Sequence, residues 1–224
     1  MIGLCGPTGA GKSTIINIFT RYYDLDSGEI RVDNQRIDEI QQDSLRSQIA
    51  QVIQEPFLFS ETIMNNLKYA KEGVSEEKSV KAAKQANAND YIMMQPQGYD
   101  TVLQDGGSDL SQGRQQMITI ARSMVAEPRM LILDEATSNL DTRTEKQIQE
   151  GFLKLQEGKT SFIIAHRLST IQNAHKILVI DKGEIIERVS HQELIDMQSF
   201  YYRLYMSQFR GKITEITRVN NLIS

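Results

Sequence analysis

A glycine-rich stretch near the start of the chain has the residue types and spacing of a phosphate-binding loop. Residues 6–13 read GPTGAGKS, which follows the pattern G-x-x-x-x-G-K-S. Its glycines allow the backbone to turn tightly, so that successive N–H groups point at one phosphate. Lys12 adds a positive charge for the β- and γ-phosphates, and the Ser13 hydroxyl suits Mg²⁺. We therefore predict a nucleotide-binding segment made of Gly6, Pro7, Thr8, Gly9, Ala10, Gly11, Lys12, Ser13 and Thr14.

Two carboxylates follow the apolar run Met130–Leu133, which reads as a strand buried on both faces. In an open α/β sheet, ligands bind at the carboxyl ends of the strands. Asp134 is therefore a candidate Mg²⁺ ligand opposite Ser13, and Glu135 a candidate to polarise a water that attacks the γ-phosphate. Gln54 also ends an expected strand, and its amide is a candidate contact for both Mg²⁺ and that water.

Two further positions lie where a phosphate group would be recognised. His166 follows the apolar strand TSFIIA, which places it on the same rim of the sheet as Asp134. Ser111 precedes a helix as its expected N-cap, and a helix N-terminus is a second anion site. A small domain that already has one phosphate loop has no evident use for a second anion site of its own. We therefore expect the site at Ser111 to serve another chain's nucleotide. His175 and His191 are expected to be structural.

The elements that must position these residues alternate between strands and helices. Alternation of this kind predicts an α/β fold with a mostly parallel sheet and helices on both faces. The helical pattern between about residues 60 and 125 interrupts it and predicts an inserted helical lobe, in which Ser60 caps a helix Glu61–Tyr69 and Ser75 starts another. A capping box Thr142-x-x-Glu145 is expected to open a later helix. The expected strands are Met1–Cys5, Glu29–Asp33, Ile49–Gln54, Met130–Leu133, Thr160–Ala165, Lys176–Ile180 and Glu184–Arg188, and the helices nearest the candidate site are Thr14–Tyr22 and Gln112–Val125.

Composition narrows the class of protein. The 224 residues carry a formal charge of −4, so no basic field favours nucleic acid. The chain has one cysteine, Cys5, in an expected buried strand, where it reads as a small core residue in a reducing compartment. No apolar run approaches the ~18–20 residues that a membrane span needs.

From about Ile2 to Phe209 the chain resembles the nucleotide-binding domain of ABC transporters, and its exporter branch in particular. The match consists of motifs in the family's order and spacing. They are the phosphate loop GPTGAGKS, Gln54 in VIQEPFLF, the signature LSQGRQQ (110–116), the strand MLILDE (130–135), SNLD (138–141) and His166 in AHRLSTI. The resemblance implies a P-loop NTPase with a RecA-like core, built from residues 1–59 and 126–209, a helical subdomain at 60–125 and a C-terminal tail at 210–224.

The resemblance also implies a mechanism. Two such domains would pair head to tail around two ATP molecules with Mg²⁺, each ATP lying between one chain's phosphate loop and the other's Ser111, Gln112 and Gly113. Glu135 would be the general base, His166 would contact the γ-phosphate, and Asp141 would communicate across the dimer. Gln54 and residues 101–107 would sense the coupling helices of a transmembrane domain. The chain would then be a soluble ATPase domain at the cytoplasmic face of the cell membrane that drives export of a small or lipophilic substrate.

The signature departs from the family's usual Leu-Ser-Gly-Gly-Gln. Gln112 replaces the first glycine and Arg114 stands where glutamine is usual, while Ser111 and Gly113 are kept. A side chain at residue 112 limits how closely the backbone approaches the partner's γ-phosphate, and Arg114 adds positive charge. Signatures of this Ser-Gln-Gly type resemble those of heterodimeric exporters, so we favour a heterodimer over a homodimer.

The family's upstream strands and adenine-stacking aromatic residue do not precede the phosphate loop here, nor does a transmembrane half. We favour a fragment of a longer protein over a natural short one. The alternative functions are a soluble ABC-type ATPase not coupled to transport, a small-molecule P-loop kinase, and a partner that binds ATP with little turnover. A signature motif disfavours the kinase, and Glu135 with His166 disfavours the inactive partner.

Overall fold

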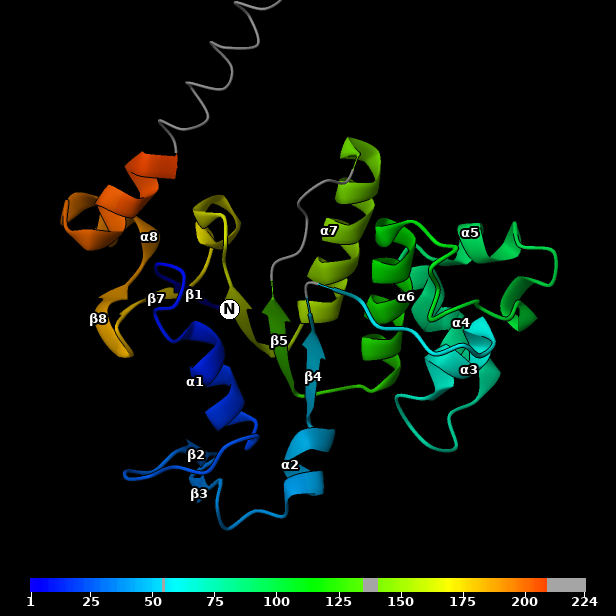
Figure 1. The fold of residues 1–224 in the computed structure, drawn as a ribbon, viewed down its shortest axis with the longest axis horizontal. Helices are drawn as coiled ribbons and strands as arrows, with labels where there is room; N and C mark the ends of the chain where they lie inside the picture. The colour runs from blue at the N-terminus through cyan, green and yellow to red at the C-terminus, as the bar shows by residue number, and fades with distance from the viewer. Residues whose placement is uncertain (54, 135–140, 209–224) are drawn as a thin grey trace, which may run out of the picture. The chain divides into compact units, whose positions relative to one another are not determined.

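A computed structural model describes residues 1–53, 55–134 and 141–208 (Figure 1). The chain divides into two compact units. The first unit joins Met1–Ile30 to the chain from Phe162 onward, and the second is Arg31–Ser161. The boundaries predicted at residues 59, 125 and 209 remain predictions.

In the first unit a short buried strand, β1, lies between two parallel neighbours. β1 (Ile2–Cys5) pairs with β6 (Thr160–Ile164) on one side and with β7 (Lys176–Asp181) on the other. β8 (Glu184–Val189) runs antiparallel to β7. Parallel strands deliver their carboxyl ends to one edge, so β1 and β6 bring their following residues to the same rim.

Helical elements cover both faces of β1 and β6. Gly3 of β1 faces η2 (Leu168–Ile171), because a Cβ built on it would lie 2.8 Å from the Cβ of Ile171. Phe162 of β6 pairs with Ile2, the residue before Gly3, so its side chain points to the opposite face of the sheet from Gly3. The ring centroid of Phe162 lies 5.4 Å from that of Phe19 in α1 (Lys12–Phe19). Since neighbouring side chains alternate between faces of a sheet, α1 and η2 lie on opposite faces.

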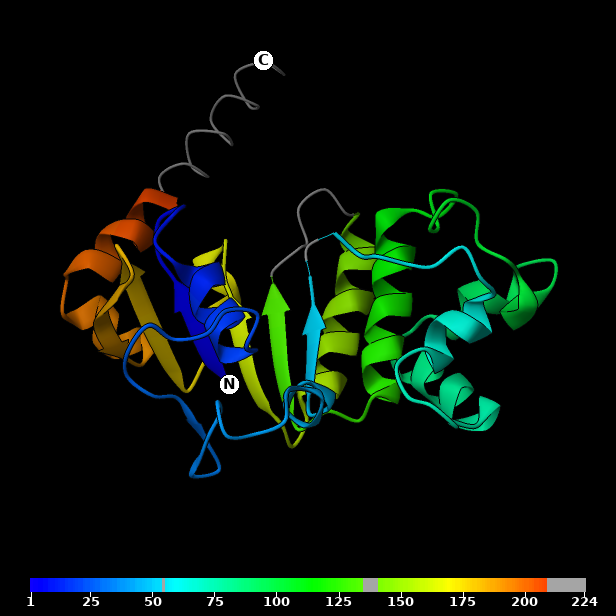
Figure 2. The same cartoon turned by 60° about the horizontal axis from the view of Figure 1, so that its bottom comes forward.

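The C-terminal part of the first unit packs on β8. α8 (His191–Asp196) begins at a capping box between Ser190 and Glu193, and residues 200–208 form a further helical stretch. The carboxylate of Glu187 in β8 accepts hydrogen bonds from the N–H groups of Phe200 and Tyr201, at 2.7 and 2.9 Å. Figure 2 shows α8 and this stretch beside β7 and β8.

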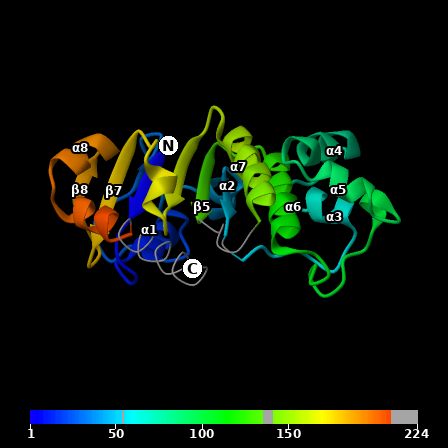
Figure 3. The ribbon, with the colours of Figure 1, turned by 90° about the horizontal axis from the view of Figure 1, so that it is seen from above.

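The second unit centres on the long helix α6 (Gln112–Val125), whose bounds agree with the prediction. α6 contacts α7 (Thr142–Gln156), α3 (Ile63–Lys68) and α4 (Glu76–Gln85), as Figure 3 shows. Met117, Ile118, Ile120 and Ala121 of α6 are buried, so this helix forms the core of the inserted lobe. The remaining elements are α2 (Gln42–Ser47), β4 (Ile49–Val52), α5 (Asn89–Met93), η1 (Gly98–Asp100) and β5 (Met130–Asp134).

The strand order of the sheet is β4-β5-β6-β1-β7-β8. β4 and β5 are parallel, and β8 is the antiparallel strand at one edge. The predicted α/β class with a mostly parallel sheet is therefore confirmed. Within the described ranges, no helix is both long and apolar enough to cross a membrane.

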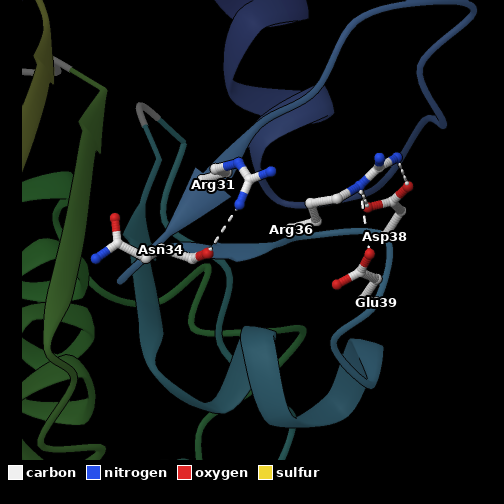
Figure 4. Close-up of polar contacts among 5 residues, drawn as sticks. All are labelled: Arg31, Asn34, Arg36, Asp38 and Glu39. Atoms are coloured by element: carbon white, nitrogen blue, oxygen red, sulfur yellow. Dashed lines mark hydrogen bonds and ion pairs between the residues drawn. The ribbon is translucent and has the colours of Figure 1, made fainter.

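A small hairpin replaces the single strand predicted at Glu29–Asp33. β2 (Arg31–Val32) pairs with β3 (Gln35–Arg36) through a turn in which Asp33 and Asn34 have φ values of 49° and 66°. Two consecutive residues with positive φ are typical of the tight turns that match strand twist. Figure 4 shows the Arg31 guanidinium donating to the Asn34 carbonyl at 3.1 Å, and Arg36 paired with Asp38 and Glu39.

Two predicted helix starts are wrong by one or two residues. The N-cap of α3 is Thr62, whose hydroxyl accepts from the Asn65 N–H at 3.0 Å, so Ser60 does not cap that helix. The N-cap of α7 is Asp141, and Thr142 is already helical. Ser75 caps α4 as predicted.

Candidate functional site

The phosphate loop joins β1 to α1, and its shape depends on glycine at the point where it leaves the strand. A Cβ on Gly6 would lie 2.0 Å from the carbonyl oxygen of Ile180 in β7, a separation that no side chain can occupy. Gly11 has a φ of 101° at the N-cap of α1. The Ala10 N–H donates to the Pro7 carbonyl at 3.1 Å and closes the turn. This is the tightly folded backbone that the glycine spacing predicts.

Lys12 brings a positive charge onto this loop. Its side chain is only 8 % exposed, and Nζ donates to the carbonyl oxygens of Gly6 and Pro7 at 2.8 and 2.9 Å. The first turn of α1 holds no acidic residue, so the positive end of the helix dipole adds to this charge. Ser13 and Thr14 are exposed in the same turn. The cation, the helix end and the open loop fit the phosphates of a nucleotide.

The turn between β7 and β8 packs against the phosphate loop and donates a hydrogen bond to it. The sequence did not predict this contact. The Gly183 N–H donates to the Ala10 carbonyl at 2.8 Å. A Cβ on Gly11 would lie 3.3 Å from the Gly183 Cα. The available signal was the sequence Asp181-Lys182-Gly183, which is typical of a turn but does not reveal what it contacts.

Cys5 lies directly before the loop and is fully buried. Burial raises the pKa of its thiol to about 12, which outweighs the opposing effect of the Lys12 charge. A thiol with so high a pKa is not a nucleophile at neutral pH. Cys5 therefore acts as the small core residue that was predicted.

His166 lies at the rim shared with the loop. Leu4 of β1 pairs with Ile164 of β6, and the Ala165 N–H donates to the Leu4 carbonyl at 2.9 Å. His166 is exposed one residue further along, while its carbonyl accepts from the Gln208 Nε2 at 3.0 Å. In the first unit the phosphate loop and His166 therefore follow the carboxyl ends of two adjacent parallel strands, β1 and β6, and lie at the same edge of the sheet.

In the second unit, Ser111 is the N-cap residue of α6 but its side chain makes no capping hydrogen bond. Ser111 and Gln112 are exposed, and Gly113 is buried. The loop before them is held by Gln115, whose Nε2 donates to the Gly107 carbonyl at 2.7 Å and to the Leu110 carbonyl at 3.3 Å. The helix therefore presents its N-terminus and an exposed hydroxyl, the arrangement that binds anions.

Arg114, which departs from the usual signature, has a specific neighbour. Its guanidinium carbon lies 4.3 Å from the ring centroid of Tyr91 in α5. Stacking on an aromatic face is a common use of arginine. The positive charge of Arg114 is therefore held against α5, near the N-terminus of α6.

Asp134 and Asp141 bracket a segment that the structure does not describe. Asp134 is half-buried at the end of β5. Asp141 accepts from the N–H groups of Arg143 and Thr144 at 3.1 and 3.0 Å. Hydrogen bonds from Thr144 and then from Arg143 lower the pKa of its carboxyl group. Glu135 and Gln54 lie outside the described residues, and the described part of the chain contains no cluster of three or more His, Cys, Asp or Glu side chains that could hold a metal.

Comparisons with known proteins point in the same direction. A family model described as "ABC transporter" matches residues 1–138. The ABC transporter ATP-binding protein YfiC of Bacillus subtilis, itself uncharacterized, is 50 % identical over 93 % of this chain and 34 % of its own length. An ATP-dependent lipid A-core flippase of Syntrophus aciditrophicus is 44 % identical over 94 % of this chain and 35 % of its own length.

A solved bacterial Atm1-family ABC exporter with ATP bound matches with a TM-score of 0.86 and 41 % identity, over 92 % of this chain and 36 % of that one. The chain thus spans about a third of these proteins, which are all longer than it is. Domains of this kind in exporters bind ATP.

Proposed function

This chain belongs to the ABC transporter family, and we propose that it is the ATP-binding and ATP-hydrolysing motor domain of an exporter. The main support for the proposal is that one chain contains two separate sites suited to phosphate. One is the phosphate loop around Lys12, and the other is the N-terminus of α6 at Ser111. The exporters among its relatives and structural neighbours favour this role over a soluble ATPase not coupled to transport.

We assign the nucleotide contacts to the residues that suit phosphate. Lys12 and the loop N–H groups of Gly6–Thr14 hold the phosphates of ATP. A hydroxyl, a carboxylate and an amide from Ser13, Asp134 and Gln54 form an oxygen set of the kind that Mg²⁺ accepts while it keeps several waters. When bound, Mg²⁺ would neutralise charge on the phosphate oxygens.

Hydrolysis then depends on side chains that act on the attacking water. Glu135 accepts a proton from that water as its oxygen attacks the γ-phosphorus and the bond to ADP breaks. Gln54 orients the same water, and His166 donates a hydrogen bond to a γ-phosphate oxygen. The proposal for His166 is supported by its place on the rim beside the loop.

The partner is a second nucleotide-binding domain. We propose that Ser111, Gln112 and Gly113 face the partner's ATP and that Asp141 communicates across the pair. Gln112 is exposed, and this side chain is the reason to favour a heterodimer over a homodimer. An active homodimer of the purified full-length protein would contradict that preference.

Gln54 and residues 101–107 would meet the coupling helices of a transmembrane domain. We therefore propose that the chain lies at the cytoplasmic face of the membrane. The predicted core parts 1–59 and 126–209, the helical subdomain 60–125 and the tail 210–224 belong to the same proposal.

The test is a Glu135→Gln variant of the assembled protein. The variant should bind ATP and retain it in a closed dimer, because the water lacks its base while the phosphate contacts remain. Light scattering at saturating ATP, together with the amount of retained ATP, measures this. Adding Lys12→Met to the variant should abolish the retained ATP. Solitary protomers at saturating ATP, as a small-molecule kinase would give, would contradict the proposal.

A further inference from the structure

One glutamine side chain is bonded to the backbone on both sides of the residue that follows His166. The Nε2 of Gln208 donates to the His166 carbonyl at 3.0 Å, and its Oε1 accepts from the Leu168 N–H at 3.0 Å. These two bonds resemble those by which a residue of a parallel strand binds two residues of its neighbour. The turn from His166 to Leu168 is therefore held by a side chain that is 42 and 40 positions away in the sequence.

The chain enters and leaves this turn through buried residues. Ala165 is buried, and its N–H donates to the Leu4 carbonyl at 2.9 Å. Leu168, the first residue of η2, is buried as well. His166 and Arg167 are exposed between these two anchored positions. The direction in which the His166 side chain extends therefore depends on the backbone of a short exposed turn.

The helical stretch that carries Gln208 is itself fixed within the first unit. Tyr201 is fully buried, and its ring is stacked with that of Tyr205 at a centroid distance of 6.3 Å. The Gln172 Nε2, directly after η2, donates to the Tyr205 hydroxyl at 2.9 Å. Gln208 follows Tyr205 by three residues, so both side chains lie on the same helix face. Figure 1 shows the end of this stretch next to the segment that follows β6.

The two bonds of Gln208 contribute more to geometry than to stability. Gln208 is exposed. Holding a long glutamine side chain in one rotamer costs conformational entropy, and its hydrogen bonds replace bonds to water, so the net gain in stability is small. A side chain that must meet one phosphate oxygen, by contrast, loses much of its effect when it is displaced by about 1 Å.

We propose that Gln208 is a positioning residue that orients His166 toward the γ-phosphate of ATP. This inference rests on the proposed function, in which His166 donates a hydrogen bond to a γ-phosphate oxygen. Gln208 fixes the backbone from which the imidazole extends, and it acts on hydrolysis through His166 alone.

The experiment compares Gln208→Ala and Gln208→Glu with the wild type in the assembled protein. The kcat for ATP hydrolysis should fall about tenfold in both variants, because a displaced imidazole no longer meets the phosphate oxygen. Glutamate should not rescue, since it keeps the acceptor for the Leu168 N–H but places an oxygen against the His166 carbonyl. The KM, the ATP bound per chain at saturation and the thermal midpoint should stay unchanged, because the phosphate loop and the core are not altered.

A double-mutant cycle with His166→Ala tests whether Gln208 acts through His166. Once the imidazole is absent, Gln208→Ala should change the remaining kcat by no more than about twofold. A further loss in the double variant as large as that in the single one would mean that Gln208 acts elsewhere, and it overturns the inference. If His166→Ala leaves no measurable turnover, the kcat and KM of the single Gln208 variants decide.

Gln192→Ala is the matched control. Gln192 is an exposed glutamine of α8 whose Nε2 donates to the Asp196 Oδ1 at 2.9 Å, and its loss should leave kcat and KM at wild-type values. A Gln208 variant that merely loosens the fold would lower the thermal midpoint and the number of ATP sites, with normal turnover at each site. That result overturns the inference, and so does failure of both Gln208 variants to fold.

The remaining outcomes separate this inference from the proposed function. Absence of ATP hydrolysis by the wild type overturns the proposed function itself. Wild-type kcat in His166→Ala overturns the role assigned to His166 and the inference with it. Normal kcat in both Gln208 variants, with hydrolysis impaired in His166→Ala, overturns only the positioning role.

Discussion

At the scale of single residues, the candidate site depends on atoms that a backbone turn brings close together. Lys12 reaches back to the carbonyls of Gly6 and Pro7, and this is possible only because the loop folds tightly onto the end of β7. The glycines are therefore needed for two separate reasons. Gly6 leaves room for a neighbouring carbonyl, whereas Gly11 supplies a backbone conformation with positive φ.

Replacing Gly6 with alanine should be far more damaging than a glycine-to-alanine change elsewhere. The new Cβ would lie 2.0 Å from the Ile180 carbonyl oxygen, so β7 must move or the loop must open. Overpacking together with an unfavourable φ should lower the free energy of unfolding by about 3 kcal/mol and abolish ATP binding. Thermal unfolding and ATP titration measure the two effects.

Gly158→Ala is the matched control, because Gly158 has a φ of 70° and no atom within 4 Å of its added Cβ. It should cost about 1 kcal/mol from the left-handed backbone alone and leave ATP binding intact. Equal losses in the two variants would show that the contact with Ile180 is unimportant.

At the scale of helices and strands, local patterns predicted the elements that have strong local signals. The bounds of α6 and the cap of α4 agree with the expectation, because capping residues and apolar spacing lie within the same few residues. The start of α3 was wrong because it is set by distant contacts. The Ile63 N–H bonds to the Thr101 carbonyl, and Thr62 forms a bridge with Val102, so the helix starts after that bridge and not at Ser60.

Contacts between residues far apart in the chain also explain which features of the candidate site could not be predicted. The phosphate loop followed from its glycine and lysine spacing, and His166 followed from the end of a buried apolar run. The support from Gly183 depends on a contact between residues far apart in the chain, and the cap provided by Asp141 depends on a choice between adjacent capping residues. Sequence spacing alone carries no information about such partners.

The stability contributed by the contact between α8 and the helical stretch of residues 200–208 should depend on pH. The His191 Nδ1 lies 2.9 Å from the hydroxyl of the fully buried Tyr201, and burial lowers the pKa of His191 below its usual 6.5. The folded state then binds fewer protons than the unfolded state as the pH falls through 6.5, so the free energy of unfolding decreases with acidification.

His191→Gln isolates this contribution from those of the carboxylates. The difference in unfolding free energy between the wild type and this variant should shrink as the pH is lowered from about 8 to about 5.5, the range in which histidine titrates. Urea unfolding at each pH provides the measurement. A difference that does not change with pH would mean that His191 titrates alike in the folded and unfolded chains.

At the scale of the whole molecule, the two anion sites of one chain make sense as halves of two shared sites. The loop around Lys12 belongs to the first unit, and the N-terminus of α6 belongs to the second. A head-to-tail pair, of two identical or two related chains, uses the corresponding two surfaces twice, so that every ATP is held by both chains. This arrangement can be tested by giving each chain a different defect.

In the Glu135→Gln background, Lys12→Met removes the phosphate cation and Ser111→Glu places a negative charge at the exposed start of α6. Each variant alone should retain no ATP. In a homodimer, an equimolar mixture should retain about a quarter of the parent's ATP, because random pairing puts one intact site into half of the dimers. Bound nucleotide after rapid gel filtration measures the recovery. If a homodimeric parent retains ATP and the mixture does not, the ATP is held within single chains, and the exposed serine at the start of α6 has no role across the dimer.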